Sequence, residues 1–333
     1  MDNILKYFLI IIPGFLALTT FSQDCDQKVL QNTPGYWKAG MKGSTYNVTA
    51  PDLAKGKAVL AAIHKMIDSG YDPIGCQALY ANSFEAPSLN SGKNWIAGNY
   101  NYSIYILNFL CDPASAIKSK SYVAIATATT VNISANVVHW LNTLHAADLP
   151  DDDNRGYLKL VKRPVLKDGY YMMGDDIEGN SERESKLVSY KWLITYDEKL
   201  PFKYISRKEY LQLIKKKLEQ TIKDDADHKQ YYTKYMDRIN DNLNMSELDL
   251  AQAAVCMWND EERFEGFVKE GTKGSFIAIK PNLDYYRKNL SKSVPQFFTV
   301  VYKVAEGDPV HVNNINAIKE AVDFDALRKM LGK

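Results

Sequence analysis

Residues 94–112 read NWIAGNYNYSIYILNFLCD, and their alternation decides the fold class. Successive side chains of a β-strand point to opposite faces of its sheet. The even-numbered positions are mainly apolar, with interruptions at Gly98 and Asn108, whereas the odd-numbered positions are polar from Asn99 to Ser103 and hydrophobic from Tyr105 onward. The stretch therefore predicts a long strand with one face in the core along its whole length and a second face that begins polar.

The following segment, SYVAIATATTVNISANVVHW (121–140), has the matching pattern, because its odd-numbered residues are mainly apolar and its even-numbered residues are small or polar. We expect the two segments to form a hairpin in which Cys111 lies opposite Tyr122, since a slip by one residue would turn the amides towards the core. This register pairs Asn101 with Asn132, Asn99 with Ser134, and Ser103 with Thr130.

These polar side chains form the candidate ligand-binding surface. Asn, Ser and Thr side chains at cross-strand distances of about 4.5–5.5 Å present ordered hydrogen-bond donors and acceptors. Exported proteins use such surfaces, with nearby Trp or Tyr, to hold sugars. The predicted binding residues are Trp95, Asn99, Asn101, Ser103, Tyr105, Thr130, Asn132 and Ser134. The simpler interpretation is a sheet face that is covered by solvent or by the later helices.

The rest of the chain predicts an α+β fold, a largely antiparallel sheet packed with helices. A helix is expected at 50–69 with Thr49 as its cap, and strands at 156–164, 169–176 and 186–197. Ser206 and Glu209 form a capping box that opens a helical segment at about 206–260, and a helix from Ser246 to Trp258 ends it. Strand patterns return after Gly271 and at 295–307, before a helical tail. Hairpin-length connections favour antiparallel pairing.

The predicted organisation has three parts: a signal peptide at 1–22, an α+β sheet domain at 23–200, and a helix-rich region at 201–333 with two late strands. If the late strands join the early sheet, residues 206–260 are a helical insertion in one domain. Small residues at Thr20 and Ser22 after an apolar stretch predict cleavage behind Ser22. That stretch is shorter than the roughly 18–20 residues of a membrane span, so we expect a secreted or periplasmic protein; a retained anchor is the alternative.

Composition narrows the class of partner. The formal net charge is +1, and no basic block is present, which argues against nucleic acid or an anionic membrane as the main partner. The 46% hydrophobic and 24% charged content is typical of a globular protein. Four cysteines in an oxidising compartment allow three pairings, and we favour Cys76–Cys111 because both residues end predicted strands. Cys256 lies in AQAAVCMW, which predicts a core thiol on a helix.

No catalytic motif is complete, and no metal site is predicted. The loop at Asp151–Asp153 begins like a calcium-binding loop, but Lys162 stands where a bidentate Glu is needed, so calcium is only a minor cofactor candidate. His139 and His145 lack zinc-ligand spacing. His64, beside the apolar stripe of its helix, is interpreted as structural. We therefore favour a non-catalytic binding protein, with a glycan or an envelope protein as partner. A secreted hydrolase with scattered catalytic residues is the alternative.

Three segments carry a resemblance to a known group: PNLDYYRKNLSKSVPQFFTV (281–300), SRKEYL (206–211) and TPGYW (33–37). They resemble segments of uncharacterised exported proteins of Bacteroidota, and the similarity covers about a third of the chain. This resemblance implies export and leaves the activity open.

Overall fold

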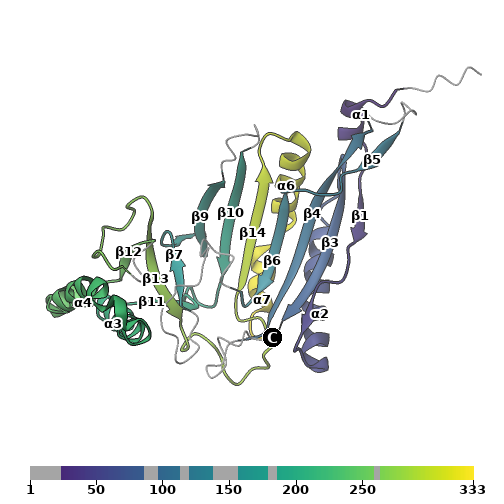
Figure 1. Cartoon of the computed structure of the whole chain (residues 1–333). Helices are drawn as coiled ribbons and strands as arrows, with labels where there is room; N and C mark the ends of the chain where they lie inside the picture. The colour runs from purple at the N-terminus through teal and green to yellow at the C-terminus, as the bar shows by residue number, and fades with distance from the viewer. Residues whose placement is uncertain (1–23, 86–96, 113–119, 138–156, 179–185, 259–262) are drawn as a thin grey trace, which may run out of the picture.

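The computed structural model describes residues 24–85, 97–112, 120–137, 157–178, 186–258 and 263–333 (Figure 1). The expected signal peptide at 1–22 lies outside these residues, as do Trp95, His139, His145 and the Asp151–Asp153 loop. Two β-sheets and their helices make up the described part, which confirms the α+β fold class.

The larger sheet runs through the centre of the molecule. Its strands in spatial order are β1 (Tyr36–Ala39), β3 (Cys76–Glu85), β4 (Asn99–Cys111), β6 (Thr130–Ala135), β14 (Phe298–Ala305), β10 (Leu187–Ile194), β9 (Tyr170–Glu178) and β8 (Val165–Lys167). Two short strands extend it, β2 (Thr45–Tyr46) beside β3 and β5 (Ser121–Val123) beside β4. Among the described strands, β1 and β2 run parallel to β3, and all other pairs in this sheet are antiparallel.

Three helices cover one face of this sheet: α2 (Ala50–Asp68), α6 (Pro309–Ala321) and α7 (Phe324–Met330) (Figure 1). Ile63 of α2, Ile133 of β6 and Ile318 of α6 are fully buried in the core between them. The predicted Thr49 cap is confirmed, because its side chain accepts a hydrogen bond from the backbone N–H of Asp52. The expected tail helix is instead two helices, since Asp323 caps the start of α7.

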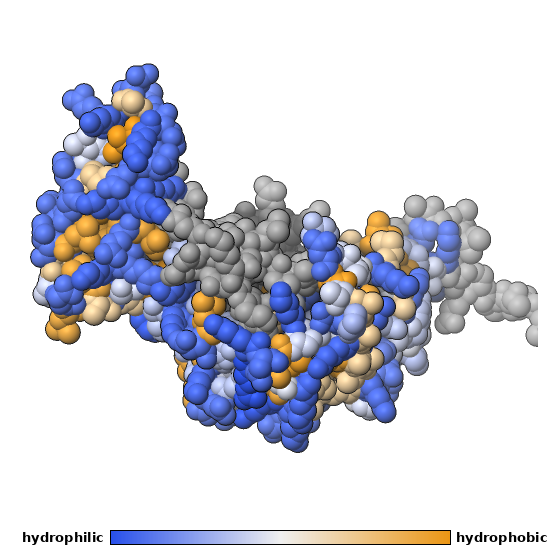
Figure 2. Space-filling view, turned by 90° about the horizontal axis from the view of Figure 1, so that it is seen from below, coloured by the Kyte–Doolittle hydropathy of each residue, from blue (hydrophilic) through white to orange (hydrophobic). Residues whose placement is uncertain are grey.

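The smaller sheet carries the helical segment. Its strands are β11 (Phe202–Tyr204), β13 (Ser275–Pro281), β12 (Val255–Met257) and β7 (Leu158–Leu160), and the other three all pair with β13. Between β11 and β12 lie α3 (Arg207–Asp224), a 3₁₀ turn (Ala226–His228), α4 (Lys229–Leu243) and α5 (Glu247–Leu250). The predicted Ser206 cap of α3 is confirmed. These helices project beyond the sheets as a lobe with a largely hydrophilic surface (Figures 1 and 2).

The late strands divide between the two sheets. β13 is the central strand of the smaller sheet, whereas β14 lies between β6 and β10 in the larger one. Conversely, β7, which comes from the first half of the chain, pairs with β13 in the smaller sheet. The chain therefore crosses between the sheets several times, and each sheet contains strands from both sides of residue 200.

The predicted disulfide Cys76–Cys111 is wrong, because Cys111 is bonded to Cys25. Cys76 lies opposite Asn108 in the β3–β4 ladder, so its side chain points to the helix-covered face. Cys111 is three residues beyond Asn108 and therefore points to the other face. Cys25 reaches it from the segment before α1 (Gln27–Gln31), which lies against the end of β4.

The helix expected from Ser246 to Trp258 is also a wrong prediction, because α5 ends at Leu250 and the chain continues into β12. Cys256 is buried as expected, but it lies on a strand, opposite Phe276 of β13. Pairing with β13 outweighs the high helix propensity of the alanines in this segment, because propensity is a weak preference that tertiary contacts override.

No helix among the described residues is long and apolar enough to cross a bilayer.

Candidate functional site

The predicted polar lattice exists on the face of the large sheet opposite to α2, α6 and α7, but its register differs by two residues from the prediction. Asn101 lies opposite Ser134, and Ser103 lies opposite Asn132. The backbone hydrogen bonds around Asn108 explain the shift, because the partner chain leaves the ladder after Ala124 and returns at Thr129. The residues between them bulge outward. Since the shift in the β4–β6 pair is an even number of residues, its polar and apolar faces remain as predicted. The expected pairing of Cys111 with Tyr122 is wrong, because Cys111 lies opposite Ser121 and Tyr122 lies opposite Leu110.

The lattice side chains bond mainly to one another. The Ser134 hydroxyl donates to Asn101 Oδ1 (2.6 Å), and the Ser103 hydroxyl donates to Asn132 Oδ1 (2.8 Å). The Asn101 amide donates to Ser103 Oγ (2.5 Å) and, at 3.5 Å, to Asn132 Oδ1. The Asn132 amide reaches Thr130 Oγ1 at 3.4 Å. Ser103 and Ser134 are buried, so the lattice forms a pre-ordered polar floor with few donors left for a ligand.

The polar face extends over strands that the hairpin prediction did not include. Thr299 of β14 lies opposite Ser134, and Lys303 of the same strand lies opposite Thr130. Ser189 and Lys191 of β10 continue the face on the other side of β14. Thr299, Ser189 and Lys191 are all buried. Burial of hydroxyl and ammonium groups is costly unless they are hydrogen-bonded or paired, which distinguishes this face from an ordinary solvated sheet surface.

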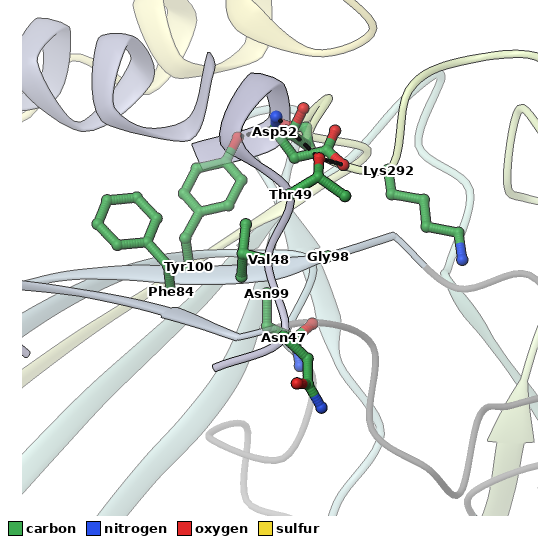
Figure 3. A pocket seen from close by; sticks show the side chains of 10 residues that line it. Asn47, Val48, Thr49, Asp52, Phe84, Gly98, Asn99, Tyr100 and Lys292 are labelled. Carbon is green, nitrogen blue, oxygen red and sulfur yellow. Dashed lines mark hydrogen bonds between the residues drawn. The ribbon is translucent and has the colours of Figure 1, made fainter. Parts of the chain in front are cut away.

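A cavity of about 150 Å³ lies at the start of β4, mainly on the α2 side of the large sheet (Figure 3). Its walls come from the loop before α2, the first turn of α2, the ends of β3 and β4, and the connection between β13 and β14. Two hydrogen bonds fix that connection to β4: the Tyr100 hydroxyl donates to the carbonyl of Ser293 (2.9 Å), and the Gly98 N–H donates to the carbonyl of Lys292 (2.6 Å). These bonds hold the β13–β14 connection against the start of β4, so this wall of the cavity is fixed in place.

Asp52 places a negative charge on one wall. Its Oδ1 accepts from the Ser291 hydroxyl and its Oδ2 from the Thr49 hydroxyl, both at 2.7 Å. These bonds, the one from Ser291 most of all, hold the pKa of the Asp52 carboxyl below its usual range, so it is ionised at neutral pH. Lys292, whose side chain is exposed, supplies an ammonium group to the rim (Figure 3).

Asn99 gives the cavity an unused acceptor. Its Oδ1 atom is buried and has no hydrogen-bond partner among the described residues. An amide oxygen in that state costs free energy unless a ligand or a water molecule satisfies it. The apolar side of the cavity is formed by Val48 and by the rings of Phe84 and Tyr100, whose centres are 6.3 Å apart; these rings lie on the α2 side of the strands, whereas the Asn99 side chain points to the other side (Figure 3). The cavity can thus hold one ring-sized group with an apolar face and a hydrogen-bond donor.

Most of the predicted binding residues are brought together. Asn101, Ser103, Thr130, Asn132 and Ser134 form the lattice, and Tyr105 lies beside it opposite Thr130. Asn99 belongs to the cavity instead, and its expected pairing with Ser134 is wrong. Trp95 lies outside the described residues. The additional residues Asp52, Lys292, Lys191 and Lys303 were missed as site residues. Lys191 on β10 and Lys303 on β14 interrupt otherwise hydrophobic strands at positions that point to the polar face, and this pattern in the sequence could have predicted them as part of that face.

Other candidate chemistry is weaker. No group of three or more His, Cys, Asp or Glu residues suited to a metal ion occurs in the described ranges. His64 is structural, as predicted: its Nδ1 is 2.7 Å from the Tyr102 hydroxyl, and its ring stacks on Tyr80 with centres 4.2 Å apart. Burial lowers the pKa of His64, which favours the neutral imidazole.

Comparison with known proteins adds no family: no family model, no curated protein and no solved structure matches this chain.

Proposed function

We propose that this protein is an exported, non-catalytic binding protein that holds the terminal sugar of a glycan in the cavity at the start of β4. The observation that carries the proposal is a cavity of ring size that joins an apolar wall to polar groups, among them Asn99, whose buried Oδ1 has no hydrogen-bond partner among the described residues. A sugar ring has the matching chemistry, since its C–H face packs on apolar side chains while its hydroxyls donate to amide and carboxylate oxygens.

The charges around the cavity agree with a hydroxylated ligand. Asp52 can accept further hydrogen bonds from hydroxyl groups, and Lys292 can donate to them from the rim. The pre-ordered lattice of Asn101 and Asn132 extends the polar surface beyond the cavity, where additional sugar units would lie. The Cys25–Cys111 disulfide supports the export part of the proposal, because disulfides persist mainly in oxidising compartments. The alternative, a secreted hydrolase with catalytic residues scattered along the chain, stays a prediction, and the histidines that would favour it, His139 and His145, lie outside the described residues.

A glycan array probed with the purified protein tests the proposal, followed by calorimetric titration of each bound glycan. Asn99→Leu keeps the side-chain shape and removes the acceptor, so we expect binding at least about tenfold weaker, equivalent to about 1.4 kcal/mol. Asn313→Ala is the matched control, because Asn313 is exposed on α6, and it should bind as the unmodified protein does. Equal affinity of Asn99→Leu and the unmodified protein would exclude this cavity. An array without any bound glycan, together with a stable co-purifying envelope protein, would replace the glycan by a protein partner.

A further inference from the structure

A second concave site lies on the helix-covered side of the large sheet. It is a groove of about 740 Å³ between β9, β10 and β14 on one side and the end of α6 and the start of α7 on the other. The lattice side chains point to the opposite face of the sheet, so the groove is separate from the polar face.

The floor of the groove contains an unsatisfied buried hydroxyl. Tyr302 of β14 lines the groove and is only 2% exposed, and its hydroxyl has no partner among the described residues. Burial raises the pKa of Tyr302, so the group stays protonated and can donate. A buried hydroxyl without a partner costs stability, so a ligand in the groove that reaches this hydroxyl would relieve that cost.

Aromatic rings form the walls. Tyr190 lies directly opposite Tyr302 in the β10–β14 ladder. Trp192, two residues further along the same face of β10, meets the ring of Phe324 edge-on with centres 5.5 Å apart. Tyr170 is fixed by a hydrogen bond from its hydroxyl to Asp325 Oδ1 (2.6 Å). A wall of positioned aromatic rings favours a ligand with flat apolar faces.

The charged groups of the groove oppose a charged ligand of either sign. Glu320, Asp323 and Asp325 place three carboxylates at the groove, which repel an anion. Lys319 lies over the ring of Tyr190, with its Nζ atom 3.7 Å from the ring centre, and so already occupies the position that a ligand cation would take. Together these groups offer both donors and acceptors to a neutral ligand rich in hydroxyls.

We propose that this groove is a second binding site and that it takes a neutral oligosaccharide, with sugar faces on Trp192 and a hydroxyl bonded to Tyr302. This inference does not depend on the proposed function of the cavity, because the two sites share no residue. The volume suits two or more sugar units.

Tryptophan fluorescence provides the test, because Trp192 lies in the groove. The full protein is titrated with four neutral tetrasaccharides, built of α-glucose, β-glucose, mannose or N-acetylglucosamine, and separately with tetralysine and tetraglutamate. We expect at least one sugar to change the emission, neither peptide to do so, and the change to disappear in Trp192→Phe. The proposal is overturned if no sugar changes the emission, if the change persists in Trp192→Phe, or if only a peptide binds.

Two variants separate binding from folding. Tyr302→Phe removes the unpartnered hydroxyl, so we expect sugar binding about tenfold weaker and a melting temperature that is unchanged or higher. Glu320→Gln, at an exposed position, should weaken binding with no change in stability. The control is Asn99→Leu, which should bind the groove sugar normally. Full affinity in both Tyr302→Phe and Glu320→Gln would refute the site, and loss of groove binding in Asn99→Leu would show that the cavity alone holds the sugar.

Discussion

Removing the Cys25–Cys111 disulfide should destabilise the protein strongly. The bond joins residues 86 positions apart, and a closed loop of that length restricts the unfolded chain by about 4.6 kcal/mol at 25 °C on the chain-entropy relation. In the native state, the backbone N–H of Cys111 also donates to Gln27 Oε1, and Gln27 donates to the carbonyl of Phe109, so α1 keeps two anchors without the disulfide. We therefore expect the paired change Cys25→Ser and Cys111→Ser to lower the free energy of unfolding by about 4–5 kcal/mol.

Urea unfolding at equilibrium, followed by tryptophan fluorescence and circular dichroism, measures this loss. The single change Cys25→Ser should cost about as much, because either change breaks the bond. Reductant should destabilise the unmodified protein by the same amount and leave the double variant unaffected, which separates the disulfide from any effect on the two buried thiols. A loss below about 1 kcal/mol, or a double variant that still responds to reductant, would refute this account of the bond.

Three further predictions concern stability. Asn136→Ala should lower the free energy of unfolding by about 3–5 kcal/mol, measured by urea titration, because it removes three buried hydrogen bonds at a residue with φ of 61°. Burial lowers the pKa of His64 and of His311, so the free energy of unfolding should be largest above their ordinary pKa and should fall as the pH drops through about 6.5. His64→Gln should reduce this pH dependence, and a variant with the same pH profile as the unmodified protein would contradict the role of His64. Gly35→Ala would place its Cβ 2.2 Å from a carbonyl oxygen of β3, so the variant should have a lower melting temperature. A melting temperature equal to that of the unmodified protein would contradict the close contact.

Sequence reasoning identified the elements whose signal is local. The alternation of residues 99–111 and the Thr49 and Ser206 caps are written in neighbouring residues, and all are present in the structure. The faces of the β4–β6 pair were also predictable, because burial of one face fixes which side chains point inward. The exact register was not, since the outward bulge between Ala124 and Thr129 has no distinctive turn residues.

The remaining errors concern contacts between distant segments. Cys25 lies in a short helix-capping region without strand character, so nothing near it indicated a partner at Cys111. β12 exists because β13 is beside it, and three residues are too few to show alternation. The cavity could not be predicted either, because its residues come from distant segments. Asn99 was selected as a polar strand residue, whereas Asp52 and Lys292 reach the cavity from a helix and from a connection that are remote in sequence.

The central place of β14 has a consequence for biosynthesis. This strand, at residues 298–305, separates β6 from β10, so both neighbours keep an unpaired edge until residues more than 100 positions after β10 are available. Unpaired edges invite association with other chains. We therefore expect assembly of the large sheet to wait until residues 298–305 have emerged, and a polypeptide that stops before Phe298 to aggregate through the two unpaired edges.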